Sequence, residues 1–101
     1  MPTPTRINYG HLRGTVYDFS VEGDVLPMHW HKPDNSHITI VARGSFRAQG
    51  PDWQRIVSSG DVINWEPYKM HEFVALEDNS RIVNIVTGPG ESISETGEIT
   101  V

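Results

Sequence analysis

The sequence predicts an all-β protein with a single domain. Its 101 residues contain about eight short runs rich in Val, Ile, Phe and Tyr, and residues that favour turns bound each run. No window of about 11 or more residues carries a helical apolar stripe free of Gly and Pro. Short strands at this spacing are typical of an all-β sandwich or barrel, and the length suits one domain.

The expected strands follow one another from residue 12 onward. They cover residues 12–20, 25–31, 37–43, 45–49, 53–57, 61–65, 71–77 and 81–87. Pairs and triplets of turn residues separate them, namely Gly23-Asp24, Gly44-Ser45, Gly50-Pro51-Asp52, Ser59-Gly60-Asp61 and Glu66-Pro67.

Three segments organise the chain. Residues 1–10 hold two prolines and little that could pack, so we expect a loose N-terminal arm. Residues 11–87 carry all the expected strands and form the β-domain. Residues 88–101 are polar and acidic, and we expect them to form a tail or an edge strand.

Alternation within two of these runs predicts which side chains share a face. In the run 37–43, one face takes His37, Thr39 and Val41, because successive side chains of a strand point to opposite sides. In the run 71–77, His71 shares a face with Phe73 and Ala75. Both faces of each run are fairly apolar, as expected for strands that are covered on both sides.

Composition excludes several classes of function. The chain has no cysteine, so disulfides and thiolate ligands are impossible. The net charge is −5 and no basic stripe exists, so nothing indicates nucleic-acid binding. No apolar run approaches the roughly 20 residues needed to span a bilayer. The polar, Pro-rich start does not resemble a signal peptide, so we expect a cytoplasmic protein without a membrane partner.

Four of the five histidines have positions that suit a metal site. His29 and His31 are two residues apart on one expected strand, so their imidazoles share a face while Trp30 points away. His37 and His71 lie on two other expected strands. Imidazole is the commonest protein ligand for transition metals. His11 falls outside this pattern and is expected at the surface.

The spacing of these histidines and of nearby glycines resembles the two motifs of the cupin superfamily. The first motif, G-x5-H-x-H-x3/4-E-x6-G, matches the stretch from Gly23 through His29, His31 and His37 to Gly44. The second, G-x5-P-x-G-x2-H-x3-N, matches from Gly60 to His71. The gap of fifteen residues between the motifs is typical of small single-domain microbial cupins. The resemblance covers roughly residues 12–87 and implies a jelly-roll β-barrel.

The chain departs from the motifs at several positions. His37 stands where cupins have Glu, after five spacer residues instead of three or four. Glu66 takes the Pro position of the second motif, and Ala75 takes the Asn position. Tyr68 replaces the Gly of the turn, so we expect either a different backbone there or strain from a positive φ.

Carried over residue by residue, the resemblance implies one divalent transition metal held by His29, His31, His37 and His71. Four neutral ligands leave the full 2+ charge on the metal, which strengthens it as a Lewis acid and attracts anionic ligands. Imidazole suits Fe, Ni, Zn, Co and Cu better than Mg or Ca, and Mn remains open as well. The sequence does not choose among these metals.

Two classes of function are compatible with such a site. The first is a small metalloenzyme that acts on a polar or chelating small molecule, either as a non-haem dioxygenase or as a Lewis-acid isomerase or lyase for sugar acids. The second is a module that binds a small molecule without catalysis. No general acid or base stands out, because Glu72 has the opposite strand parity to His71 and Glu66 lies on a turn.

The aromatic residues and the open sheet edges complete the prediction. Phe46 and Phe73 are candidates for the walls of a substrate pocket. Trp30 is assigned to packing, whereas Trp53 and Trp65 fit a pocket, a core or a dimer interface. The family resemblance also suggests a homodimer formed through sheet edges, since so short a chain needs its edges covered.

Overall fold

The computed structural model is built from β-strands alone. It describes residues 1–9, 12–31, 37–86, 92–94 and 99–100, and of Tyr9, His31 and the last two of these segments it describes the backbone only. The strands are β1 (Thr3–Tyr9), β2 (Leu12–Phe19), β3 (Val25–His31), β4 (His37–Arg43), β5 (Ser45–Gln49), β6 (Gln54–Ser58), β7 (Val62–Trp65), β8 (His71–Ala75), β9 (Ser80–Val86), β10 (Ser92–Ser94) and β11 (Ile99–Thr100). The predicted all-β class is confirmed, and each of the eight expected strands is present. No helix that could cross a bilayer occurs in these residues.

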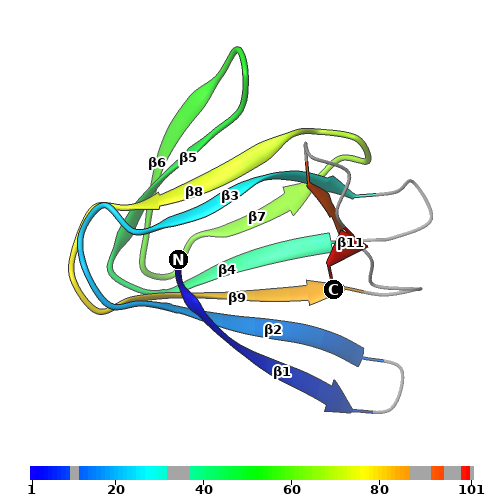
Figure 1. Cartoon of the computed structure of the whole chain (residues 1–101), viewed down its shortest axis with the longest axis horizontal. Helices are drawn as coiled ribbons and strands as arrows, with labels where there is room; N and C mark the ends of the chain where they lie inside the picture. The colour runs from blue at the N-terminus through cyan, green and yellow to red at the C-terminus, as the bar shows by residue number, and fades with distance from the viewer. Residues whose placement is uncertain (10–11, 32–36, 87–91, 95–98, 101) are drawn as a thin grey trace.

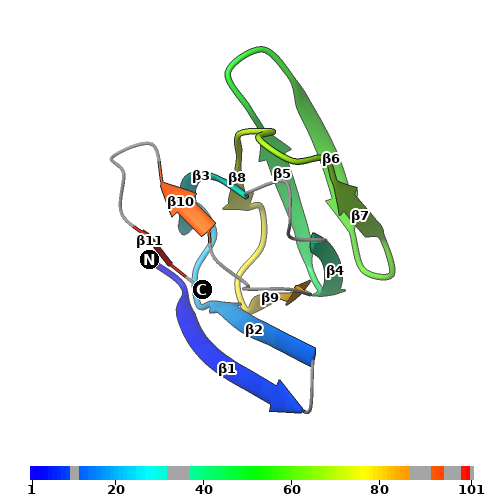
Figure 2. The same cartoon turned by 90° about the vertical axis from the view of Figure 1, so that its right-hand side faces the viewer.

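The strands form two antiparallel sheets that enclose one core (Figure 1). The first sheet has five strands in the order β1-β2-β9-β4-β7, and the second has six in the order β11-β10-β3-β8-β5-β6. Strands far apart in sequence are therefore neighbours, as β2 is with β9 and β3 with β8. This crossing of the chain between two sheets gives the jelly-roll barrel. Figure 2 views the barrel from the side where β3 ends and β4 begins.

The N-terminal segment differs from the expected loose arm. Residues 3–9 form β1, which pairs with β2 along its whole length, from Thr3 opposite Asp18 to Tyr9 opposite Leu12. Pro4 is tolerated because β1 is an edge strand, where a missing N–H costs little. Residues 92–94 and 99–100 form β10 and β11, which extend the second sheet beyond β3.

Inward-facing side chains change in character along the barrel. One end is apolar, where Phe46 packs edge-to-face on Phe19 with ring centroids 4.8 Å apart. Both phenylalanines are fully buried, as are Val41 and Ile82, which share the first sheet with Phe19. Towards the other end the buried residues become polar, with Thr39 and Asn84 followed by the histidines. The apolar end supplies the core, and the polar end supplies the candidate site.

Two glycines in tight turns provide a test of this backbone. Gly44 (φ 82°) and Gly60 (φ 94°) both have left-handed conformations. A Cβ on Gly44 would lie 2.8 Å from the Cβ of buried Ser80 and even closer to its hydroxyl, whereas a Cβ on Gly60 would meet nothing within 4 Å. Gly60→Ala should therefore cost only the left-handed backbone, about 1–2 kcal/mol. Gly44→Ala should cost roughly 1–3 kcal/mol more because of the overlap.

Urea unfolding of the two variants measures this difference. Equal losses of unfolding free energy in Gly44→Ala and Gly60→Ala would contradict the close packing of the Gly44 turn against Ser80.

Candidate metal centre

His29 and His71 face each other inside the barrel. They are directly paired on the antiparallel strands β3 and β8, and their ring centroids are 4.3 Å apart. His29 is 7% exposed and His71 is fully buried. Neighbouring strands thus bring together two imidazoles that are 42 residues apart in the sequence (71 − 29).

An irregularity in β3 makes this pairing possible. Leu26 pairs with Phe73 and His29 with His71, so three steps on β3 match two steps on β8. Such an extra residue is a β-bulge, and Pro27 favours it because proline cannot donate to the ladder. The bulge lets Leu26 and His29 both point inward, although strict alternation over three residues would place them on opposite faces.

Backbone carbonyls hold both rings in one tautomer. His29 Nδ1 lies 2.8 Å from the carbonyl oxygen of Pro27, and His71 Nδ1 lies 2.7 Å from that of Lys69. A carbonyl oxygen only accepts, so each Nδ1 carries the proton and donates it. Each Nε2 then bears the lone pair that a metal needs, and this kind of second contact orients the histidine ligands of known metal sites.

His37 comes from the other sheet. It lies on β4, is 1% exposed, and its ring centroid is 6.0 Å from that of His71. Its backbone partner on β7 is Trp65, whose indole stacks on His71 with centroids 3.8 Å apart and planes 6° from parallel. Three predicted ligands therefore gather at one end of the barrel, and Trp65 packs between the sheets beside them.

His31 is the fourth predicted ligand, and its side chain lies outside the described part of the structure. Its backbone ends β3, two residues beyond His29. Among the side chains that the structure describes, no three His, Asp or Glu residues form a group that could hold a metal ion. The donor set nevertheless fits a transition metal, because His29 and His71 are neighbouring imidazoles and each uses Nδ1 for a backbone carbonyl, which makes Nε2 the atom that would bind the metal.

Burial affects the ionisation of His29. It lowers the pKa of this imidazole below the usual value of 6.5, and the hydrogen bond to the Pro27 carbonyl opposes this with a smaller effect. Desolvation disfavours the charged ring, so His29 is neutral near pH 7 in the fold. A neutral imidazole is the form that binds metals.

This shift predicts an acid-sensitive metal-free protein. The unfolded chain takes up a proton at His29 near pH 6.5, whereas the folded chain does so only at lower pH, so protons favour unfolding. The melting temperature should fall as the pH drops from 7 through 6.5 and below. The melting temperature of His29→Gln, whose side chain cannot titrate, should fall less over that pH range. Equal falls in melting temperature for the wild type and the variant would contradict a contribution from His29.

A buried chain of hydrogen bonds continues from Trp65 across the first sheet. The indole Nε1 of Trp65 donates to the Thr39 hydroxyl at 2.9 Å, and this hydroxyl donates to the Asn84 side-chain carbonyl at 2.6 Å. The chain fixes the Trp65 indole, which in turn fixes the plane of His71. Strand parity predicted Thr39 on the His37 face, but no sequence signal predicted the stack of Trp65 on His71.

Phe46 and Phe73, the two predicted pocket walls, are both fully buried in the hydrophobic core. Phe73 lies nearer the histidines, with its ring centroid 6.2 Å from His71 and 5.8 Å from Trp65. Phe46 lies on the far side of Phe73 from the histidines, with the two ring centroids 6.0 Å apart. The structure thus puts Phe73 beside the candidate site and Phe46 a layer deeper, while their contact with a substrate stays a prediction.

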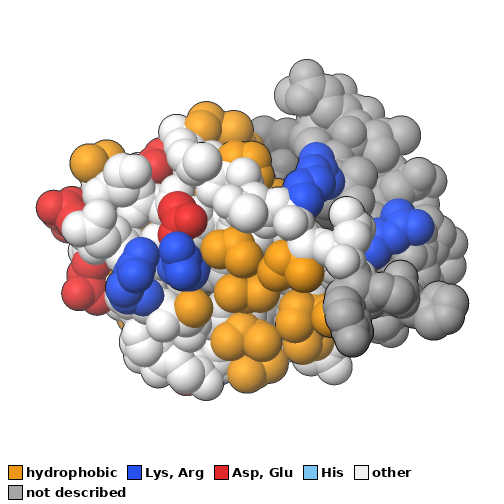
Figure 3. All heavy atoms as spheres, turned by 90° about the horizontal axis from the view of Figure 1, so that it is seen from below, with side chains coloured by type: hydrophobic (Ala, Val, Ile, Leu, Met, Phe, Trp, Pro, Cys, Tyr) orange, Lys and Arg blue, Asp and Glu red, His pale blue; other side chains and the backbone are white. Residues whose placement is uncertain are grey.

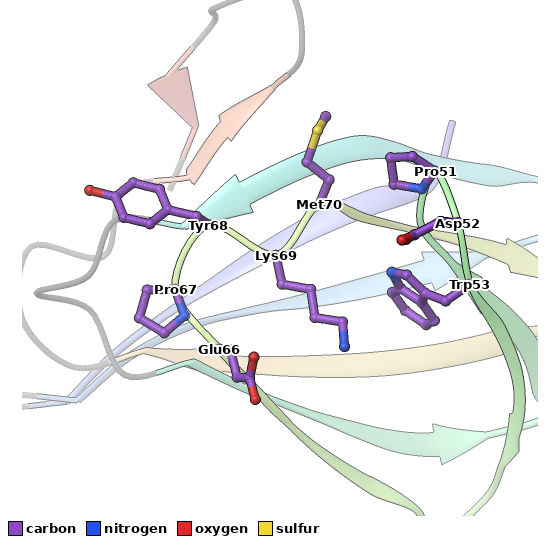
Figure 4. Close-up of a pocket in the computed structure, with 8 residues that line it drawn as sticks. All are labelled: Pro51, Asp52, Trp53, Glu66, Pro67, Tyr68, Lys69 and Met70. Atoms are coloured by element: carbon purple, nitrogen blue, oxygen red, sulfur yellow. The ribbon is translucent and has the colours of Figure 1, made fainter.

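A surface pocket of about 530 Å³ opens next to this end of the barrel (Figure 4). Its walls are the β5–β6 turn (residues 51–53) and the β7–β8 turn (residues 66–70). Lys69 Nζ lies 5.0 Å from the ring centroid of Trp53, and Trp53 contacts Trp65 with centroids 5.8 Å apart. Aromatic contacts thus connect the pocket wall to the ring that stacks on His71.

Tyr68, where the cupin motif has glycine, has a φ of 64°. Positive φ is uncommon for residues other than glycine, so this turn keeps the glycine-like backbone and carries its strain. The Tyr68 ring packs on Trp30 at 5.4 Å and is 60% exposed. Figure 4 shows it directed away from Lys69 and Trp53.

Solved structures with the same fold share this arrangement of strands. KdgF from Halomonas sp. is 24% identical, with a TM-score of 0.74 over 85% of this chain and 77% of that one. An uncharacterized conserved protein with a double-stranded β-helix domain from Klebsiella pneumoniae is 18% identical, with a TM-score of 0.79 over 96% and 84%. An RmlC-like cupin protein from Desulfovibrio desulfuricans is 17% identical, with a TM-score of 0.75 over 85% and 81%.

The chain has the cupin fold. The expectation drawn from the glycine and histidine spacing is therefore confirmed for the architecture. No family model matches this chain, and no curated protein matches it either.

Proposed function

We propose that this cupin binds one divalent transition metal through His29, His31, His37 and His71 and acts on a small polar or chelating molecule, as non-haem dioxygenases do. The observation that carries the proposal is the pairing of His29 with His71, each with Nδ1 held by a backbone carbonyl. Such second contacts are typical of histidines that serve as metal ligands. His37 on the facing sheet and His31 on β3 would complete the set.

The metal would supply Lewis acidity, and with iron also the activation of oxygen beside the substrate. The residues of the chain supply orientation and exclusion of water. The His71 ring is clamped between the Lys69 carbonyl and the Trp65 indole, so it cannot rotate freely. Phe73 and Trp65 surround it with apolar surface, which strengthens electrostatic interactions at the site.

A second candidate is a Lewis-acid isomerase or lyase for sugar acids. The hydrogen-bonded set of Trp65, Thr39 and Asn84 favours it, because hydroxyl and amide groups on the inner face suit a hydroxyl-rich substrate. Redox chemistry would not be needed in that case. A module that binds such a molecule without turnover shares the same site.

Metal analysis followed by activity assays tests the proposal. Protein grown in metal-replete medium should contain close to one metal ion per chain by elemental analysis. The iron-loaded protein should then consume oxygen with a diketone, a thiol or a catechol. Conversion of a sugar acid without oxygen uptake, followed by NMR, would favour the isomerase or lyase. A raised melting temperature without turnover would favour the binding module, and metal-free protein would refute the site.

A further inference from the structure

The inner face of the five-stranded sheet carries two arginines at its polar end. Arg13 has the same strand parity as the buried residues Thr15 and Phe19 of β2, so it belongs to the face that lines the barrel. Arg6 on β1 pairs directly with Thr15 and shares that face. The register gives two neighbouring rows across the sheet, one of Asn8, Arg13, Val86, His37 and Trp65, and one of Arg6, Thr15, Asn84, Thr39 and Ile63.

Arg13 shares its row with His37, one of the four proposed metal ligands. Val86 of β9 pairs with both residues, so two strand spacings of about 4.8 Å, roughly 10 Å in total, separate their backbones. Arginine lays its aliphatic stem along apolar surface and keeps its charged head in water, and Arg13 is exposed at the end of the barrel that holds the histidines. A small molecule bound at the histidines would therefore lie within reach of its guanidinium.

The charge of Arg6 also acts on the inner side of the sheet. Tyr17 has the same strand parity as Thr15 and packs against the hydrophobic core. Burial raises the pKa of the Tyr17 hydroxyl, and the positive charge of Arg6 lowers this pKa with a smaller effect. Because a charge interaction weakens with distance, the Arg6 guanidinium lies near Tyr17 on the inner side. In the described strands, Arg6 and Arg13 are the only residues of the two rows with a permanent charge.

Structural roles explain other arginines better than they explain Arg13. At the opposite end of the barrel, Asp18 accepts a hydrogen bond of 2.6 Å from Arg81 Nε and lies 3.8 Å from Arg43. Figure 3 shows basic side chains towards both ends of the molecule, whereas the acidic side chains coloured in that view gather at one end. A charge on the edge strand β1 can block the addition of a further strand, which accounts for Arg6. Arg13 has no edge to protect, since β2 lies between β1 and β9.

We propose that Arg13, with the charge of Arg6 beside it, binds a carboxylate of the small molecule that the metal centre takes. The substrate is then a carboxylic acid that also carries oxygen atoms for the metal, and this assignment rests on the proposed function. Arginine suits the task because its planar guanidinium can donate two parallel hydrogen bonds to one carboxylate. The chain has a net charge of −5, so it needs local positive charge to select an anion.

Calorimetric titration of the Zn²⁺-loaded protein with two pairs of probes tests the proposal. Protocatechuate carries a carboxylate that its amide lacks, and galacturonate carries one that galactose lacks. In at least one pair, the acid should bind at least about 10-fold more tightly than its neutral partner. Arg13→Gln should weaken binding of that acid about 10–100-fold and leave the affinity for the neutral partner unchanged. Arg13→Lys, which keeps the charge but not the paired hydrogen bonds, should give an intermediate affinity.

Arg47→Gln is the matched control. It removes the same charge from the outward side of β5, where Arg47 alternates with the buried residues Phe46 and Ala48, so the preference for the acid should persist. Circular dichroism and melting temperature show that each variant is folded. Equal losses of acid affinity in Arg47→Gln and Arg13→Gln would overturn the proposal in favour of a general effect of net charge.

The zinc content of the same samples separates this proposal from the proposed metal centre. A wild type that holds close to one Zn²⁺ per chain but prefers neither acid would overturn the role of Arg13 and leave the metal centre standing. An acid preference that survives in Arg13→Gln would do the same. A chain that takes up no Zn²⁺ would refute the metal centre and, with it, the substrate assignment.

Discussion

His29→Ala is expected to abolish metal binding, with the affinity for a probe ion such as Zn²⁺ falling more than 100-fold. The imidazole of His29 is paired with that of His71 on the neighbouring strand, and its Nδ1–H is held by the Pro27 carbonyl. Loss of the contact that orients a ligand already costs about 10–100-fold in metal affinity, and loss of the ligand itself should cost more. Calorimetric titration of metal-free protein measures the change.

The other histidines make the test specific. His37→Ala should weaken Zn²⁺ binding less than His29→Ala does. His37 comes from the facing sheet, and its ring centroid lies 6.0 Å from that of His71. His11→Ala, which removes the histidine outside the motif, should leave binding unchanged. A metal content that survives His29→Ala would exclude the proposed centre, whereas loss of binding in His11→Ala would indicate nonspecific binding of the probe.

Strand positions and side-chain parity were largely predictable from the sequence. The runs 37–43 and 45–49 coincide with β4 and β5, because Gly44 at φ 82° separates two alternating segments. Parity correctly placed His37, Thr39 and Val41 on the buried face of β4. In these segments hydrophobic alternation and turn chemistry agree, so local sequence is sufficient.

Other features depend on long-range contacts that local patterns do not encode. Alternation alone gives no reason to expect a bulge at Pro27, yet the bulge sets the pairing of His29 with His71. The stack of Trp65 on His71 joins β7 to β8 across two sheets, and nothing near either residue in the sequence indicates it. β1 was also unexpected, because its strand conformation depends on pairing with β2 rather than on its own composition.

Phe46→Ala is expected to destabilise the fold by about 3–5 kcal/mol, because it empties a fully buried site in the core. The ring centroid of Phe46 lies 4.8 Å from that of Phe19 and 6.0 Å from that of Phe73. These two rings would therefore border the cavity that Phe46→Ala leaves. Such a loss is a large fraction of the 5–15 kcal/mol that typically stabilises a domain. Urea unfolding should show a lower midpoint for Phe46→Ala. Phe46→Leu should lose much less unfolding free energy.

The same pair of variants separates the core role of Phe46 from its predicted role in a substrate pocket. Phe46 lies one layer deeper than Phe73, which is the phenylalanine next to His71. If Phe46 only fills the core, the folded Phe46→Leu protein should keep its metal content and its affinity for any small molecule that the wild type binds. A change in ligand affinity at unchanged metal content would instead make Phe46 part of the pocket wall. An unfolding free energy within about 1 kcal/mol of wild type in Phe46→Ala would contradict the packing of this core.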